Sequence, residues 1–340
     1  MFRNFRLPFL FVIEIGILAG CADSVPYPKH VAPEHSKIVD QLVSLHARVL
    51  TDDEGHVAEV RFSYNDEARN PTVSDAQISF LSRVDSLTSL DLWQTDVTDE
   101  GLASLVSLSN LQILLLPYIT DRSTSHIGKL TGLRELHGTG NLRALSLGKN
   151  TLTDAGLKNL AGLTRLESLD ISETRITSQG LQHLSAMDKL RWLRLSGTTV
   201  DDDGLEYLNE LPSLTQVEAT HTAISDEGIK RLKPLLQRLE VIYLSSTPIS
   251  NESLRHINGS PKLKKLWLDN TAITDEGLSY LSDLPQLDEI VLNELSVTDK
   301  GVAQLSNFKT LRRVFLYGNS VSSHCIEQLK QQLPELRIIH

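Results

Sequence analysis

The chain has 340 residues, of which 40% are hydrophobic and 22% charged, a composition typical of globular proteins and not of disordered ones. Its net charge of −10 argues against a nucleic-acid partner, because affinity for nucleic acid depends on neutralising phosphates with Lys and Arg. The two cysteines, Cys21 and Cys325, cannot form a disulfide framework. A single compact core seldom grows to this length, so the sequence predicts either two domains or an elongated repeat.

Residues 1–20 have the features of a targeting segment. Arg3 and Arg6 precede a mostly apolar run from Leu7 to Gly20. That run is shorter than the roughly 20 apolar residues that a membrane-spanning helix needs. It ends in "LAGC", which resembles the bacterial lipoprotein signal. The resemblance implies that residues 1–20 are removed, that Cys21 is lipidated, and that the protein is extracytoplasmic and lipid-anchored in the bacterial cell envelope. A plain signal peptide or a mispredicted start is the alternative.

The next segments predict a tether and a cap. Residues 21–35 contain Pro26, Pro28 and Pro33 in a polar context, which is typical of a semi-extended tether. Residues 36–56 are expected to form an N-terminal capping helix and turn. Apolar residues recur at helical spacing between Ser36 and Leu50, and "TDDEG" follows as the turn.

From Val57 onward the chain repeats one unit, LxxLxL followed by about 18 further residues. The copies begin at Val57, Leu87, Leu111, Leu142, Leu166, Leu190, Leu214, Leu239, Leu263, Leu287 and Leu311, with a clipped copy at Leu336. Most steps are 24 or 25 residues. The two longer steps contain the insertions "SYNDEARNPT" (63–72) and "GLRELHGTGN" (132–141).

Each position of the unit has a physical interpretation. Positions 4 and 6 share one face of a strand. Position 9 is usually Thr, whose hydroxyl can satisfy backbone groups where the chain leaves the strand. Ser or Thr followed by Asp or Glu then predicts a capped helix start. One helix column holds small residues, which indicates close approach of the neighbouring coil: Gly101, Gly156, Gly180, Gly204, Gly228, Ser253, Gly277, Gly301 and Cys325. Cys325 is therefore interpreted as a packing residue.

These units resemble leucine-rich repeats, and the resemblance covers residues 57–340. "ITDEGL" is similar to the helix-bearing, cysteine-containing or ribonuclease-inhibitor-like subclass, although Thr stands here where that subclass has Cys. The resemblance implies an α/β fold, a right-handed solenoid with a concave parallel β-sheet and convex short helices. It also implies that a partner binds on the concave face.

Strand positions 3, 5 and 7 are expected to face that concave side, and aromatic residues gather there. All three tryptophans, Trp93, Trp192 and Trp267, occupy these columns although only 5% of the chain is aromatic. Exposed aromatic residues beside Arg are typical of interaction hot spots. The predicted ligand-binding residues are Trp192, Arg194, Tyr243, Trp267, Asp269, Asn293, Arg313, Phe315 and Tyr317, with Val291 filling an apolar patch. The alternative is a stripe that packs on itself or is covered by the tether.

No metal or cofactor is expected. Helix capping explains the row of acids, which comprises Asp99, Glu100, Asp154, Asp202, Asp203, Asp226, Glu227, Asp275, Glu276 and Asp299. Only "DDD" at 201–203 is a place to look for a cation. The histidines form no HxxxH pair.

The sequence thus predicts a non-enzymatic, membrane-tethered binding protein for a protein or peptide ligand, with no nucleic-acid partner. An enzyme acting on carbohydrate through Glu218 and Asp269 is one alternative, and a structural surface protein is another. A homodimer through the C-terminal strand edge is a further expectation. Position 2 of the strands also predicts a ladder of alternating charge that includes Glu240, Lys264, Asp288 and Arg312.

Overall fold

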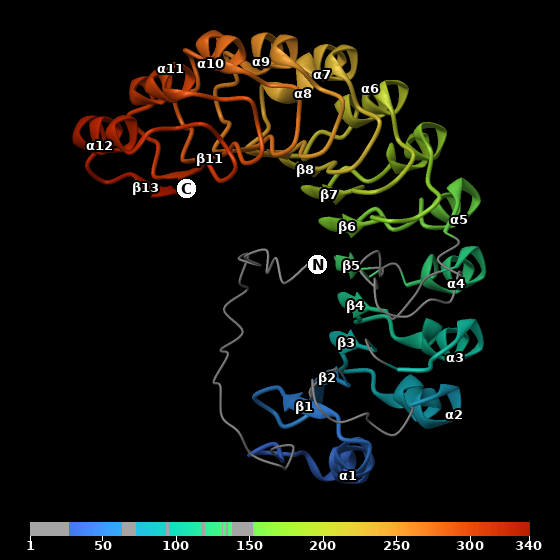
Figure 1. Ribbon diagram of the computed structural model, residues 1–340. Coiled ribbons are helices and arrows are strands. Elements are labelled where there is room, and N and C mark those ends of the chain that lie inside the picture. The colour runs from blue at the N-terminus through green and yellow to red at the C-terminus, as the bar shows by residue number, and fades with distance from the viewer. Residues whose placement is uncertain are drawn as a thin grey trace.

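The computed structural model describes residues 27–62, 73–92, 95–116, 120–130, 132–133, 135–137 and 152–340. Thirteen strands of this part form one sheet in chain order. β1 pairs antiparallel with β2, and every later pair is parallel. Strands line the inside of a curved solenoid and helices its outside (Figure 1). The structure confirms the predicted leucine-rich-repeat-like α/β solenoid.

The strands are β1 Arg48–Thr51, β2 Val57–Arg61, β3 Ser89–Asp91, β4 Ile113–Leu115, β5 Glu135–His137, β6 Ser168–Asp170, β7 Trp192–Arg194, β8 Gln216–Glu218, β9 Val241–Tyr243, β10 Lys265–Trp267, β11 Glu289–Val291, β12 Arg313–Phe315 and β13 Arg337–Ile339. The α-helices are α1 Ser36–Ser44, α2 Asp75–Ile78, α3 Asp99–Ala103, α4 Asp121–Ile127, α5 Asp154–Asn159, α6 Leu205–Asn209, α7 Asp226–Arg231, α8 Lys233–Leu236, α9 Asn251–Ile257, α10 Asp275–Tyr280, α11 Asp299–Val302 and α12 Ser323–Gln332. The 3-10 helices are Pro33–His35, Ser79–Arg83, Ser104–Ser107, Ser178–Leu184, Asp202–Gly204 and Ala303–Asn307.

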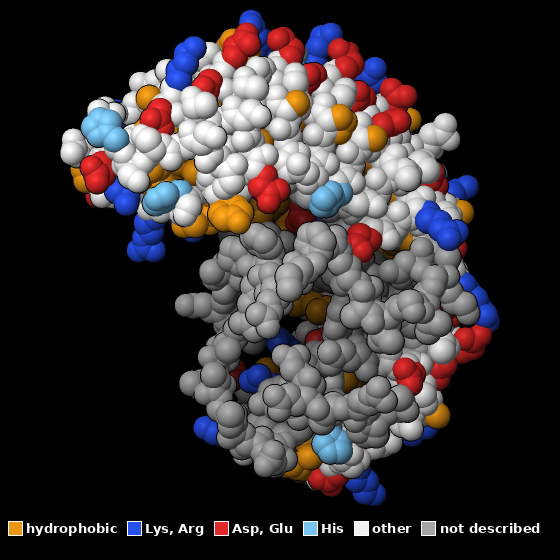
Figure 2. Space-filling model, in the orientation of Figure 1, with side chains coloured by type: hydrophobic (Ala, Val, Ile, Leu, Met, Phe, Trp, Pro, Cys, Tyr) orange, Lys and Arg blue, Asp and Glu red, His pale blue; other side chains and the backbone are white. Residues whose placement is uncertain are grey.

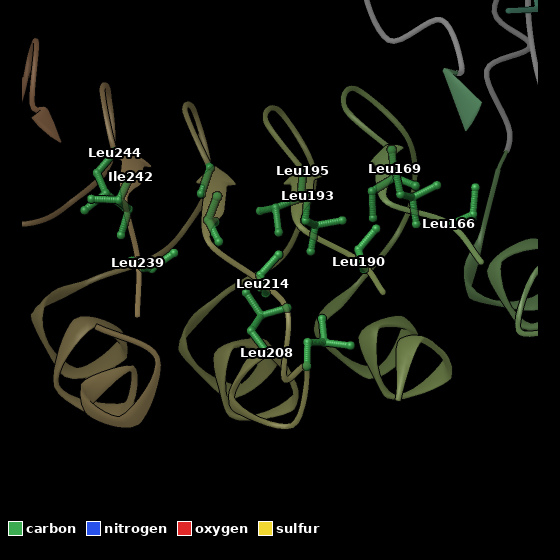
Figure 3. Close-up of a cluster of buried hydrophobic side chains, with 14 of the residues drawn as sticks. Leu166, Leu169, Leu190, Leu193, Leu195, Leu208, Leu214, Leu239, Ile242 and Leu244 are labelled. Atoms are coloured by element: carbon green, nitrogen blue, oxygen red, sulfur yellow. The ribbon is translucent and has the colours of Figure 1, made fainter. Parts of the chain in front are cut away.

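The LxxLxL positions form the core between the sheet and the helices. Position 4 of successive strands is paired in register, from Leu193 through Val217 and Ile242 to Leu266. These side chains are buried in one core cluster with leucines from the helices, such as Leu208, and from the segments that lead into the strands, such as Leu214 (Figure 3). Each coil therefore supplies core to its neighbours, which is why a single unit has no stability of its own.

One predicted repeat boundary is wrong. The unit expected to begin at Leu142 has its strand earlier, because β5 is Glu135–His137 and pairs with β4 and β6. Leu133 occupies the buried first position. The strand thus comes from "LRELHG", which the sequence analysis assigned to an insertion, and residues 138–151 lie outside the described residues.

The N-terminal prediction also needs correction. The capping helix α1 ends at Ser44, and residues 48–51 form β1 instead of continuing the helix. Residues 27–35, predicted as tether, contact this cap: Ala32 N donates to Gly55 O at 2.8 Å and Thr51 Oγ1 donates to His30 O at 2.8 Å. Cys21 and residues 1–26 lie outside the described residues.

The position-9 threonines bond to the backbone of the turn where the chain leaves the strand, as predicted. The hydroxyl of Thr198 donates to Leu195 O at 2.6 Å, three residues back. Five further threonines make the same bond at 2.6–2.7 Å, namely Thr95, Thr174, Thr222, Thr247 and Thr271. The turn is therefore satisfied internally.

The helix-start acids do something the sequence did not reveal. They were expected to stabilise their own helix, but the Asp at the first helical position accepts hydrogen bonds from the next coil. Thr177 donates from its N at 2.8 Å to Asp154 Oδ1 and from its Oγ1 at 2.6 Å to Asp154 Oδ2. We call this pair of bonds the inter-coil clasp. Equivalent clasps join Asp75 to Thr98, Asp121 to Thr153, Asp202 to Ser225, Asp226 to Ser250, Asp275 to Thr298 and Asp299 to Ser322.

The clasp explains the column of small residues. A Cβ built on Gly180 would meet Asp154 Oδ1 far inside van der Waals contact. In other coils the Oδ1 atom of the corresponding clasp aspartate blocks a Cβ in the same way, at Gly101, Gly156, Gly228 and Gly301. Ser123 and Ser253 fill the column in two coils. Ser253 donates its hydroxyl to the clasp aspartate Asp226, and Ser123 donates its hydroxyl to Asp99, which also accepts from Thr120 Oγ1. Cys325 is buried in this column, as predicted.

One coil exchanges the two partners of the clasp. Ser178 stands where other coils have Asp, and Asp201 stands where they have Ser or Thr. Asp201 N donates to Ser178 Oγ at 2.9 Å, and Ser178 Oγ donates to Asp201 Oδ1 at 2.5 Å. In "DDD", Asp201 therefore bonds to the previous coil, Asp202 forms the clasp with Ser225 of the next coil, and Asp203 pairs with Arg231.

Within the described part of the chain, no helix is long and apolar enough to cross a membrane.

Candidate functional site

The nine predicted ligand-binding residues all lie along the concave face between β7 and β12. Position 5 is paired in register from Arg194 through Glu218, Tyr243, Trp267 and Val291 to Phe315. Asp269, Asn293 and Tyr317 each lie two residues beyond a strand. The structure divides these residues into three groups.

The first group surrounds Arg194 on β7. Its guanidinium lies over the Trp192 ring, 3.8 Å from the centroid. Arg194 Nη1 is 3.3 Å from Asp170 Oδ2, and Arg194 Nε is 3.5 Å from Glu218 Oε2. Burial raises the pKa of Glu218, Asp170 raises it further, and Arg194 opposes the shift. One arginine is therefore shared by two carboxylates.

The second group surrounds the stacked rings of Tyr243 and Trp267, whose centroids are 4.1 Å apart. Trp267 Nε1 donates to Glu289 Oε1 at 2.7 Å. Arg313 Nε is 2.8 Å from Glu289 Oε2, and Arg313 Nη2 is 3.2 Å from Asp288 Oδ2. Burial raises the pKa of the Tyr243 phenol, and the charges of Glu289 and Glu218 add to the shift.

The third group is a row at the carboxyl ends of the strands. Ser245 Oγ donates to Asp269 Oδ2 and Asn293 N donates to Asp269 Oδ1, both at 2.9 Å. Tyr317 N donates to Asn293 Oδ1 at 2.9 Å. Burial raises the pKa of Asp269 despite these bonds.

The apolar patch differs in one respect from the prediction. Val291 is buried, so it supports the patch from below and does not form its surface. Tyr317 is 58% exposed, and Ile339 on the edge strand β13 is 45% exposed. Hydrophobic side chains gather at the inner edge of the C-terminal half, whereas charged side chains cover the convex helices (Figure 2).

The predicted hot-spot residues are less free than expected. Trp267 is half-buried outside the core cluster, so the outward assignment of position 5 is correct, but its ring already has two protein partners. Asp170 and Glu289 also belong to these groups but were not predicted. They could have been found from their strand positions, 5 and 3, because both positions face the concave side next to Arg or aromatic residues of neighbouring strands. Trp93 lies outside the described residues.

Other predicted sites are accounted for by internal contacts. Asp203 pairs with Arg231 at 2.7 Å and Asp202 forms a clasp with Ser225. The described residues contain no group of three or more His, Cys, Asp or Glu placed to hold a metal ion. Glu218 and Asp269, the candidate catalytic carboxylates, lie on or beside β8 and β10, with β9 between them.

Comparisons with known proteins agree with this architecture. Leucine-rich-repeat family models match residues 140–200, and also 86–106 and 259–282. No curated protein matches the chain by sequence.

Two solved structures share the fold. The chain is similar to an internalin of Listeria monocytogenes, with 23% identity, a TM-score of 0.54, and coverage of 77% of this chain and 76% of the internalin. It is also similar to TLR13 in the TLR13–ssRNA13 complex, with 19% identity, a TM-score of 0.53, and coverage of 85% of this chain but only 39% of TLR13. The repeat-model matches and the two structures therefore agree on a leucine-rich-repeat solenoid fold.

Proposed function

We propose that the protein is a membrane-tethered, extracytoplasmic recognition protein that binds a protein or peptide on its concave face. The leucine-rich-repeat fold favours protein recognition in general. One observation carries the proposal further. The solenoid repeats its core and its clasps almost without change, yet the concave columns differ in every strand from β7 to β12 and concentrate aromatic and charged side chains there.

A role in binding, without catalysis, forms part of the proposal. Each carboxylate of the candidate catalytic pair has a structural partner: Glu218 contacts Arg194 and Ser196, and Asp269 accepts from Ser245 and Asn293. Such bonds fix the two side chains as parts of a surface. Glycoside hydrolysis instead needs two carboxylates that flank the scissile bond.

Photo-crosslinking tests the concave assignment. A photo-reactive phenylalanine analogue replaces Tyr317 on the concave face or, as the matched control, exposed Lys230 on convex helix α7. We expect a discrete protein adduct in cells from position 317 only, and loss of that adduct when Trp267→Ala is added. Equal adducts from both positions would contradict concave recognition.

The location rests on "LAGC" and has its own test. Cys21→Ala should move the protein out of the membrane fraction, and mass spectrometry of the native protein should find lipid on Cys21. Recovery of a soluble product that keeps residues 1–20 would disprove the lipid anchor while leaving the recognition proposal standing.

A further inference from the structure

The concave face binds guanidinium groups of its own chain in two places. Arg194 lies on the Trp192 ring between Asp170 and Glu218. Arg313 lies between Asp288 and Glu289, and Glu289 in turn accepts from Trp267 Nε1. Both arrangements combine one cation with two carboxylates, and a tryptophan belongs to each: the Trp192 ring face lies under Arg194, and Trp267 donates to a carboxylate that Arg313 contacts. Carboxylates attract a guanidinium, and so does an aromatic ring face.

The region between the two arginines has the same components, and within the described part of the chain one of its carboxylates, Asp269, has no ion-paired cation. The Tyr243–Trp267 stack lies at its centre, with Glu218 on one side and Asp269 on the other. Among the described residues, no Lys or Arg forms an ion pair with Asp269, whose polar contacts are Ser245, Asn293 N and its own backbone. In the described part of the chain, Glu218 pairs with one arginine, Arg194, which also pairs with Asp170, and the Glu218 side chain remains 30% exposed.

Lys265 does not fill this position. It lies at the opposite end of β10 from Asp269, paired in register with Val241 and Glu289. Asp269 is four residues after Lys265, which corresponds to about 13 Å at 3.3 Å per residue of extended chain.

The surrounding charge is negative. At strand positions 3, 5 and 7 from β6 to β12 the concave face carries four acids, Asp170, Glu218, Asp269 and Glu289, and three bases, Arg194, Lys265 and Arg313. The rim beside Asp269 is formed by position 8 of each unit, directly after position 7. From β6 to β12 this position contains two acids, Glu173 and Glu294, and no Lys or Arg. Its other five residues are Gly197, His221, Ser246, Asn270 and Gly318. This charge repels phosphate groups and attracts a cation.

We propose that the surface formed by Tyr243, Trp267, Glu218 and Asp269 recognises a basic side chain, Arg or Lys, in an extended segment of the partner protein. The partner's cation would lie between Arg194 and Arg313 and would be held, like them, by carboxylates and an aromatic ring. The inference rests on the proposed concave recognition and names the chemistry of the ligand. Burial raises the pKa of both Asp269 and Glu218, so a bound cation would stabilise the two carboxylates in their charged form.

A peptide-library selection on the full chain tests the inference. Phage-displayed random dodecamers are selected, and the enriched peptides are synthesised and titrated against the wild type, Trp267→Ala, Asp269→Asn and Glu218→Gln. Glu252→Gln, on convex helix α9, is the control because it removes the same charge from the other face. Thermal melting checks that each variant folds.

We expect the enriched peptides to share an Arg or Lys. Replacing that residue by Gln, or introducing Asp269→Asn, should weaken binding at least tenfold, while Glu252→Gln should change it less than twofold. A charge exchange, with Glu in the peptide and Asp269→Lys in the protein, should recover part of the lost affinity, and this recovery cannot arise from misfolding.

The two proposals fail in different ways. Peptides that need Trp267 but contain no shared basic residue, or that ignore Asp269→Asn, would overturn the cation inference and leave concave recognition intact. Peptides that bind Trp267→Ala as well as the wild type, or a selection that yields no binder, would count against both.

Discussion

The helical side and the concave side of this solenoid obey different rules. On the helical side one contact recurs: in most coils an aspartate accepts two hydrogen bonds from the Ser or Thr of the next coil, and Asn251 takes this place before Thr274. Even where Ser178 and Asp201 are exchanged, two bonds remain. On the concave side neighbouring strands never repeat a residue at position 5 from β7 to β12. We therefore infer that the contacts on the helical side stabilise the fold, whereas the residues on the concave side determine which partner binds.

The largest effect should follow from removing one clasp. Asp226 accepts four hydrogen bonds at 2.5–3.1 Å, from the backbone N and the Oγ of both Ser250 and Ser253, and Asp226→Ala removes this acceptor. We expect the free energy of unfolding to fall by about 3 kcal/mol, because charged hydrogen bonds are lost and polar groups between coils are left unpaired. Chemical denaturation measures it, and a loss below about 1 kcal/mol would contradict the role of the clasp.

The same clasp predicts a pH dependence. Burial alone would raise the pKa of Asp226, but the hydrogen bonds from Ser250 and Ser253 outweigh it and hold the pKa below its ordinary value. A carboxyl whose pKa is lower in the folded state stabilises the protein above its unfolded pKa, about 4, and loses that contribution as the pH falls through the folded pKa. Wild-type stability should therefore decline more steeply below pH 4 than that of Asp226→Asn.

The small column should be nearly as sensitive. Gly180→Ala places a Cβ against Asp154 Oδ1, so the coils must separate, at a cost of about 2 kcal/mol. Gly180→Ser should cost less, because its hydroxyl can donate to Asp154 as Ser253 does to Asp226. Melting temperatures of the two variants decide this, and an alanine variant as stable as the wild type would show that the column is small for another reason.

Left-handed backbone at the rim predicts a smaller, stabilising change. His221 has φ 56°, whereas Gly197 fills the equivalent position of the previous coil at φ 68°. His221→Gly should raise the free energy of unfolding by about 0.5–1 kcal/mol, since glycine adopts this conformation without steric cost. Gly197→Ala is the matched opposite and should lower it. If both changes act in the same direction, the rim conformation is not the cause.

The smallest effect concerns the predicted charge ladder, which the structure retains in part. Lys264 Nζ is 2.8 Å from Glu240 Oε2 as expected, but Arg312 pairs with Glu335 and Asp288 pairs with Arg313. Lys264→Glu should cost a few tenths of a kcal/mol at low salt and nothing measurable at high salt, because the pair is exposed. An equal loss at both salt concentrations would point to packing instead.

Most of the fold could be predicted because it depends on position-specific contacts that recur. The buried leucines, the turn threonines and the helix starts follow from their spacing alone. The strand at Glu135–His137 could not be placed, because its "LRELHG" lacks the third Leu, while Leu142 offers a better match to the pattern. The inter-coil clasp could not be predicted either, because its two partners lie about 23 residues apart. Helix capping within a single coil already accounts for both the Ser or Thr and the Asp.

The concave site was predictable in position but not in detail. Alternation along the strands correctly placed Trp267 and Arg313 on the concave face. It could not show that Glu289 joins them, or that Arg194 lies on Trp192, because such contacts depend on rotamers across neighbouring strands.

The division between the two sides is tested most directly by comparing Trp267→Ala with Asp226→Ala. For each variant, the free energy of unfolding and the yield of the concave crosslink from position 317 are measured together. We predict that Trp267→Ala lowers the unfolding free energy by no more than about 1.5 kcal/mol, the scale of one aromatic pair, while the crosslink falls at least tenfold. Asp226→Ala should show the larger loss of stability. A Trp267→Ala variant that unfolds as readily as Asp226→Ala, or that keeps its full crosslink, would contradict the assignment of fold to one side and recognition to the other.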